Sequence, residues 1–372
     1  MDIDEYARRF DEEPGYLDFA AVGPMGRTVR EELAGLTEMQ ARARFGWHAA
    51  FAEQDARMRE AVAALTGFPA GRIVFQPNTS TALMHAMFGI TGGVALSPAE
   101  FPALTYAVDR AAASLGVLAP TWLETDHGRV TPGELVGQLD TAVAVALSLV
   151  DFRTGFLADL EGIRQVAGDR LVIVDATQCF GVVDVPWELA DVVVAGGQKW
   201  PRAGWGTGFL ALSERALDHL TPVWSGFAGD EGDGMALDEI RPPAAGAARF
   251  SISNPDPIAQ GRLAAALEEI AAVGVGAINA RLAVQVSRII DLADEFAVPV
   301  VSPRAENERA GIVVLEPAAD QLTQLAASLH NHGVSATVRA GTVRLSAHAS
   351  TEEETFTMLR SALQSFATLT AV

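Results

Sequence analysis

Short apolar runs alternate with longer amphipathic stretches over much of the chain. Runs rich in Val, Leu and Ile, bounded by turn residues, predict seven buried β-strands at 72–77, 92–97, 116–124, 142–151, 170–176, 190–196 and 206–213. Between them, apolar residues recur at helical spacing in 56–67, 80–89, 104–116 and 159–169. The alternation predicts an α/β fold with one large, mainly parallel sheet.

The pattern changes after residue 224. Residues 225–257 are rich in Gly, Pro and acidic residues and predict a long surface excursion. A long helix is expected over 257–295, broken near the glycines at 274–276. A smaller domain follows, with strands at 311–317 and 336–348 around a helix at 320–333. We therefore divide the chain into an N-terminal segment (1–15), a large domain (16–250) and a small C-terminal α/β domain (251–372).

Charge and cysteine content exclude several classes of protein. The formal net charge of -20 disfavours nucleic acid and anionic membrane surfaces as partners. The chain has one cysteine, Cys179, and neither a CxxC nor an HExxH pattern, so we expect no disulfide and no metal site. The acidic start and the absence of a long apolar run predict neither a signal peptide nor a membrane span. A cytoplasmic location fits best.

Lys199 is the only lysine among 372 residues, and the other 26 of the 27 Lys and Arg residues are Arg. A lysine amine can lose its proton when desolvated and then act as a nucleophile or a base, which a guanidinium cannot do. The alternative interpretation of this count is that the sequence is biased towards arginine and that Lys199 remains by chance, without a special role.

Two other groups are expected beside Lys199, at the carboxyl ends of the parallel strands, where open α/β sheets bind ligands. Thr79, Ser80 and Thr81 lie between a strand and a helix and could bind an anion, although ordinary helix capping explains them as well. Asp175 ends a buried apolar strand, where a cap or turn role is the alternative. An anion site, a carboxylate and a lysine together match the needs of pyridoxal phosphate (PLP).

These motifs resemble those of the fold type I PLP enzymes, in particular the class V aminotransferase family, which includes cysteine desulfurases, kynureninase and isopenicillin epimerase. The similar segments are 16–26 (YLDFAAVGPMG), 78–86 (NTSTALMHA), 175–181 (DATQCFG), 196–200 (GGQKW) and 343–354 (VRLSAHASTEEE). The resemblance covers nearly the whole chain and implies a PLP-dependent homodimer with its active site at the subunit interface.

The resemblance also implies a role for individual residues. Lys199 would bind the cofactor aldehyde, Asp175 its pyridine nitrogen, and Gln178 would lie near its 3-oxygen. Gln198 stands where a phosphate-contacting histidine is common, and Ser253 or Asn254 would reach a phosphate in the neighbouring subunit. Arg344 would bind the α-carboxylate of an amino acid substrate, a task that suits a forked guanidinium.

Departures from the family pattern narrow the reaction. Cysteine desulfurases carry a loop with a catalytic cysteine shortly before the arginine that binds the substrate carboxylate. Residues 333–346, which precede and include Arg344, contain no cysteine. Cys179 is expected to be a small buried residue. The ring-stacking histidine is missing, and Phe101, Pro102 or Tyr106 could replace it. Arg153 is a candidate for substrate binding, with a role in a strand-end turn as the equal alternative.

The reaction options are β-elimination, epimerisation, transamination and retro-Claisen cleavage. The segments EFPA, DFRTGFLADLEGI and GGQKW, with the short ending VRAGTVRLSAH, most resemble the carbon–sulfur lyases of ergothioneine biosynthesis. That resemblance implies cleavage of hercynylcysteine sulfoxide to a sulfenic acid, pyruvate and ammonia. The aromatic residues in 44–51 and the acidic loop at 230–233 are further candidates for binding its trimethylammonium group, although core packing is the stronger expectation for the first. A PLP fold without catalysis is the remaining alternative.

Overall fold

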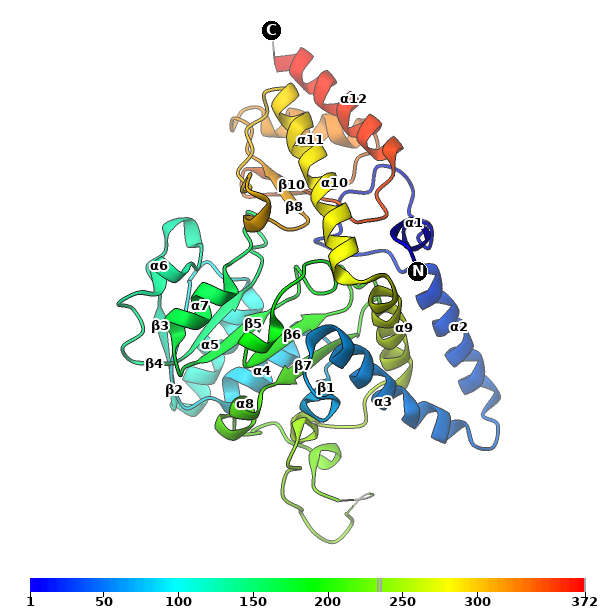
Figure 1. Ribbon diagram of the computed structural model, residues 1–372, viewed down its shortest axis with the longest axis vertical. Coiled ribbons are helices and arrows are strands. Elements are labelled where there is room, and N and C mark those ends of the chain that lie inside the picture. Colours follow the sequence, from blue (N-terminus) through cyan, green and yellow to red (C-terminus); the bar gives the residue numbers. More distant parts are fainter. Residues whose placement is uncertain (233, 235, 371–372) are drawn as a thin grey trace.

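The protein, described here by a computed structural model that covers residues 1–232, 234 and 236–370, contains one large sheet and one small one (Figure 1). The large sheet has seven strands in the order β1-β7-β6-β5-β4-β2-β3. Strands β2 to β6 run parallel, and β7 is antiparallel to both of its neighbours, β6 and β1. The strand bounds are β1 Ile73–Phe75, β2 Gly92–Leu96, β3 Leu118–Trp122, β4 Ala142–Ser148, β5 Leu171–Asp175, β6 Val192–Gly196 and β7 Gly208–Leu212.

The large sheet is covered on both faces. Leu171 and Ile173 pack into a core formed with α4 (Thr79–Gly89), α5 (Pro102–Leu115) and α8 (Glu214–His219), while Val172 and Val174 pack into the opposite core with α3 (Trp47–Thr66) and α7 (Leu160–Ala167). Alternate side chains point to opposite faces, so a strand buried on both sides is a continuous apolar run. The seven predicted strands and the α/β fold class are confirmed.

The small sheet consists of β8 (Ile312–Leu315), β10 (Thr342–Ser346) and β9 (Thr337–Arg339), in the order β8-β10-β9. It packs with α10 (Val275–Glu295) and α11 (Leu322–Asn331), and α12 (Glu353–Thr370) packs on these two helices. The predicted single strand 336–348 is instead a hairpin, because Ala340 and Gly341 both take positive φ angles of 47° and 85° and form a two-residue turn.

The predicted break in the long helix is confirmed at Gly274, where φ is 89°. It separates α9 (Pro257–Val273) from α10, and the two helices are bent by 84°. Helix α9 packs on α2 (Arg27–Arg42) and α3, whereas α10 packs on β8 and α12. By packing, the change from the large to the small unit therefore lies at this bend.

No single helix among the described residues is long and apolar enough to cross a membrane. Within the part of the chain that the structure describes, α9 and α10 reach the required length and composition only as a pair, across their 84° bend.

An N-terminal strap, residues 8–26, follows the short helix α1 (Ile3–Ala7) and connects the two units. The strap is hydrogen-bonded to the small unit, since the backbone N–H of Ser346 donates to the carbonyl of Leu17 in the strap at 2.7 Å. It bonds the large unit through the N–H of Gly23, which donates to the carbonyl of Gln198, next to Lys199, at 2.8 Å. The strap therefore touches the lysine segment and the strand that carries Arg344.

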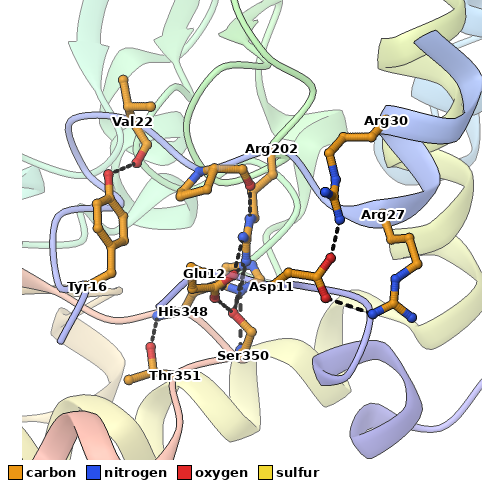
Figure 2. Close-up of polar contacts among 11 residues, drawn as sticks. Asp11, Glu12, Tyr16, Val22, Arg27, Arg30, Arg202, His348, Ser350 and Thr351 are labelled. Carbon is orange, nitrogen blue, oxygen red and sulfur yellow. Dashed lines mark hydrogen bonds and ion pairs between the residues drawn. The ribbon is translucent and has the colours of Figure 1, made fainter. Parts of the chain in front are cut away.

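The strap is fixed by a buried arginine, Arg202, which lies three residues after Lys199 and is 1% exposed (Figure 2). Its guanidinium forms an ion pair with Glu12 of the strap and donates to the hydroxyl of Ser350 at 2.9 Å. Its guanidinium carbon lies 3.8 Å from the ring centroid of Phe10. The backbone of Arg202 has a φ of 59°, in the left-handed region, which costs a non-glycine residue about 1 kcal/mol. These contacts hold the strap, the lysine turn and the small unit together.

Candidate active site

A cavity of about 740 Å³ lies at the carboxyl ends of β4, β5 and β6, against the N-terminus of α4. The small unit closes one side of it with Thr337, Arg339 and Arg344 of the β9–β10 hairpin. Of the residues predicted for the site, seven line this cavity: Thr79, Ser80, Asp175, Gln178, Gln198, Lys199 and Arg344.

Lys199 follows β6 and its amine points to the aromatic side of the cavity. The Nζ atom lies 5.4 Å from the centroid of the Phe101 ring. Burial, aided by the charges of Arg344 and Arg339 and opposed by those of Asp175 and Asp18, lowers the pKa of Lys199 to about 8. The amine is therefore neutral in a useful fraction of molecules near neutral pH, as a nucleophile or base requires.

Asp175 is the last residue of β5 and is only 5% exposed. Burial raises the pKa of Asp175, which the hydrogen bonds from Thr177 and the charge of Lys199 oppose. One carboxylate oxygen, Oδ1, accepts the backbone N–H of Thr177 at 2.9 Å, and Oδ2 accepts no hydrogen bond from the described residues. A buried carboxylate with one free oxygen suits a positively charged N–H donor in the cavity.

The N-terminus of α4 offers polar groups to the same cavity. Asn78 caps the helix, since its Oδ1 accepts the N–H of Thr81 at 2.9 Å. Thr79 and Ser80 line the cavity, and so does Gln198, whose side-chain amide forms no hydrogen bond with the described residues. Thr81 bonds its hydroxyl to Asn78 at 3.1 Å and does not line the cavity. The helix terminus and the free amide suit an anion.

Arg344 lies on β10 and is 9% exposed. Its guanidinium donates to the carbonyl of Phe152 at 3.2 Å and to the hydroxyl of Thr337 at 3.3 Å, and it lies 3.7 Å from the carboxylate of Asp18 in the strap. Burial lowers the pKa of Arg344, which Asp18 opposes. The guanidinium is thus held in a fixed orientation at the cavity wall.

Gln178 lines the cavity and also contacts the strap, whereas Arg153 and Asn254 lie in other cavities. The Nε2 atom of Gln178 donates to the carbonyl of Ala20 at 3.1 Å, and its Oε1 accepts the indole N–H of Trp200 at 3.0 Å, so this side chain also holds the strap. Arg153 pairs with Asp151 at 2.8 Å and lines a neighbouring cavity of about 240 Å³. Asn254 lies away from Lys199, in a cavity of about 800 Å³.

Among the three candidates for ring stacking, Phe101 lines the cavity, whereas Tyr106 is 59% exposed and does not. The Phe101 ring meets that of Phe152 edge to face, with centroids 5.1 Å apart. Several residues that line the cavity were not predicted as site residues from the sequence, among them Ser148, Trp205, Thr337 and Arg339. The hydroxyl of Ser148 is buried and forms no hydrogen bond among the described residues, which leaves it available to a ligand.

Comparison with known proteins agrees with the fold and with the predicted cofactor. No family model matches the chain. A kynureninase from Deinococcus radiodurans is 31% identical over 244 residues, a match that covers 62% of this chain and 57% of that protein. The chain thus matches little more than half the length of this relative.

Solved structures match over nearly the whole chain. The apo structure of a cysteine desulfurase from Thermococcus onnurineus NA1 has a TM-score of 0.84 and 25% identity, covering 97% of each chain. The cystine C–S lyase C-DES, in complex with its product cysteine persulfide, has a TM-score of 0.83 and 19% identity, covering 94% of this chain and 97% of that one. A C-DES variant carries glycine covalently linked to its PLP cofactor.

The fold is therefore that of the fold type I PLP-dependent, class V-like enzymes, as predicted. The comparisons also agree with the predicted enzyme class and with PLP as its cofactor. The cavity fits this group, because a single space offers a partly neutral lysine amine, a buried carboxylate with a free oxygen and a helix N-terminus. The described residues contain no group of three or more side chains placed to hold a metal ion.

Proposed function

We propose that this chain is a PLP-dependent carbon–sulfur lyase that performs β-elimination on a cysteine S-conjugate, with hercynylcysteine sulfoxide as its substrate. The observation that carries the proposal is the combination of Lys199, Asp175 and Arg344 in one cavity that no cysteine lines. The bound cofactor would supply an electron sink for the negative charge that develops on the substrate Cα.

The protein groups have distinct tasks in this proposal. Lys199 would hold the cofactor aldehyde in the resting enzyme and, once released by the incoming amino acid, take the proton from Cα as general base. Its pKa of about 8 suits both tasks near neutral pH. Asp175 would hold the proton of the pyridine nitrogen through its free Oδ2, and Thr79, Ser80 and Gln198 would hold the phosphate. Arg344 would orient the α-carboxylate, and Phe101 would cover one face of the ring.

The leaving group is proposed to be a sulfenic acid because the cavity supplies no thiol acceptor. Cys179 is fully buried, its Sγ donates to the carbonyl of Ala176 at 3.4 Å, and burial raises the pKa of its thiol. A desulfurase needs a thiolate to take up sulfur, whereas a sulfoxide leaves by breaking only its Cβ–S bond. The electron pair of that bond leaves with sulfur as a sulfenate, whose oxygen is protonated to give the sulfenic acid, and hydrolysis of the remaining aminoacrylate gives pyruvate and ammonia.

A kynureninase-like cleavage is the second candidate, which the 31% identity with a protein named kynureninase favours. It would give alanine and an aromatic acid rather than pyruvate. Epimerisation, transamination and a PLP fold without catalysis remain further alternatives.

The test is pyruvate release from purified holoenzyme, measured with lactate dehydrogenase and NADH. We expect hercynylcysteine sulfoxide to give pyruvate far faster than S-methyl-L-cysteine sulfoxide does, and kynurenine to give no alanine. Alanine formation from kynurenine would favour the second candidate. No pyruvate from any sulfoxide, with the cofactor bound, would exclude the lyase.

We also propose that the enzyme is a cytoplasmic homodimer in which Asn254 reaches the neighbouring subunit. Support comes from large exposed apolar side chains: Phe227, which lines the cavity of Asn254, is 50% exposed, and Phe45 and Ile240 are fully exposed. Covering such side chains would be favourable in a dimer. Light scattering should give twice the 39.2 kDa mass of one chain, and a monomer mass at micromolar concentration would contradict the proposal.

A further inference from the structure

The β9–β10 hairpin places a second arginine beside Arg344. Its register pairs Thr337 with Arg344 and Arg339 with Thr342. Because side chains alternate between the faces of a strand, these four residues share one face of the hairpin. Arg339 and Arg344 are then diagonal neighbours, and such positions lie about 7–8 Å apart, within reach of one ligand.

The two arginines differ in how they are held. Arg344 is nearly buried and bonded to Phe152, Thr337 and Asp18. Arg339 is exposed, and its guanidinium forms no hydrogen bond or ion pair with the described residues. Its guanidinium carbon lies 5.9 Å from the ring centroid of Phe152. Arg339 is thus a cation at the cavity mouth whose hydrogen-bond donors are free.

Arg339 lines a second cavity next to the main one. This second cavity of about 240 Å³ shares Phe152, Thr337, Arg339 and Arg344 with the main cavity. Its third arginine, Arg153, is already paired with Asp151, and its one acid, Glu316, is exposed and forms no ion pair among the described residues. The charge of Arg339 therefore remains available to an anionic group of a ligand.

We propose that Arg339 is a specificity-determining residue that binds a second carboxylate, carried by the leaving part of the substrate. One arginine, Arg344, suffices for the α-carboxylate, and the free guanidinium of Arg339 stands next to it over the same cavity. The inference rests on the proposed lyase function and deepens it. It assigns to the enzyme cysteine S-conjugates with a distal carboxylate, a class to which the hercynyl conjugate belongs.

The test compares two sulfoxides that differ only in charge, S-(2-carboxyethyl)- and S-(2-carbamoylethyl)-L-cysteine sulfoxide. In the wild-type holoenzyme we expect the carboxylate to be preferred by about 10- to 100-fold in kcat/KM, since hydrogen bonds to charged groups are worth that much. Arg339→Gln should remove the preference, because KM rises far more for the carboxylate than for the amide substrate. Arg339→Lys should restore part of it.

A matched control is Val338→Gln on the same strand, because Val338 faces the other side of the hairpin and is 47% exposed. It should leave the preference unchanged. If Arg339→Gln lowered kcat/KM equally for both sulfoxides, Arg339 would serve the α-carboxylate or the hairpin itself, and the inference would be overturned.

A binding measurement separates this inference from the lyase proposal. The thioethers S-(2-carboxyethyl)- and S-(2-carbamoylethyl)-L-cysteine would be titrated into holoenzyme by calorimetry. Tighter binding of the carboxylate that is lost in Arg339→Gln would support the subsite even if no sulfoxide gave pyruvate. Equal binding of both thioethers by the wild type would overturn the subsite even if the lyase assay succeeded.

Discussion

Lys199→Ala is expected to lower pyruvate formation by at least about 10³-fold and to leave the fold intact. Lys199 is the only lysine of the chain, its amine lies in the cavity, and no other lysine can replace it as nucleophile and base. The measurement is the rate with hercynylcysteine sulfoxide, together with the far-ultraviolet circular dichroism spectrum. Lys199→Arg is the matched control, since it keeps a positive charge but cannot act as a base at neutral pH. Activity in either variant above about one hundredth of the wild-type rate would contradict the assigned role.

Because the pKa of Lys199 is lowered, the reactivity of its amine towards PLP should depend on pH. Burial disfavours the charged amine, so the neutral form dominates above pH 8 rather than above the ordinary 10.5. At pH 7 about one amine in ten is neutral, against about one in three thousand for an ordinary lysine. Covalent labelling of the apoprotein by PLP, trapped with borohydride and located by mass spectrometry, should therefore rise with pH and level off near pH 8 to 9. A rise of the label at Lys199 that continues beyond pH 10 would exclude a depressed pKa at this residue.

Arg202→Met is expected to lower the free energy of unfolding by about 3–5 kcal/mol, since it leaves a carboxylate without its partner in a largely buried site. Arg202 forms an ion pair with Glu12, and the two side chains are 1% and 11% exposed. The backbone N–H of Arg202 also donates to the carbonyl of Lys199 at 3.1 Å. We therefore expect weaker PLP binding as well, because the lysine turn loses its side-chain contacts with Pro24 and Glu12 of the strap. Urea unfolding and equilibrium titration of the apoprotein with PLP would measure the two effects.

Two further variants interpret that result. The double variant Arg202→Met with Glu12→Leu should lose less than the sum of the single variants, because it leaves no unpaired charge. Arg42→Met breaks an exposed pair with Glu38 and should cost under about 1 kcal/mol. If Arg202→Met cost no more than Arg42→Met, the buried pair would not fix the strap.

The sequence by itself determined the seven strands, most helices and the residues at the strand ends. Strands buried on both faces are continuous apolar runs, and helices such as α5 show their period in a short window, so local patterns suffice. Asp175 ends one such run and Lys199 lies three residues after another, so the sequence predicts both at the same edge of the sheet. Motif resemblance added Arg344, which lies far along the chain.

The tertiary structure alone decided how distant segments meet. The pair Arg202–Glu12 joins residues 190 positions apart, and Asp18 reaches Arg344 across a still longer separation. The sequence placed Thr81 and Asn254 with the cofactor residues, whereas in the described chain neither lines the cavity of Lys199. Arg339 had no sequence signal, because its role depends on a hairpin register and on Phe152 from another element. A single charged side chain produces no periodic pattern in the sequence. Its partner depends on how the chain folds back over hundreds of residues and not on the residues next to it.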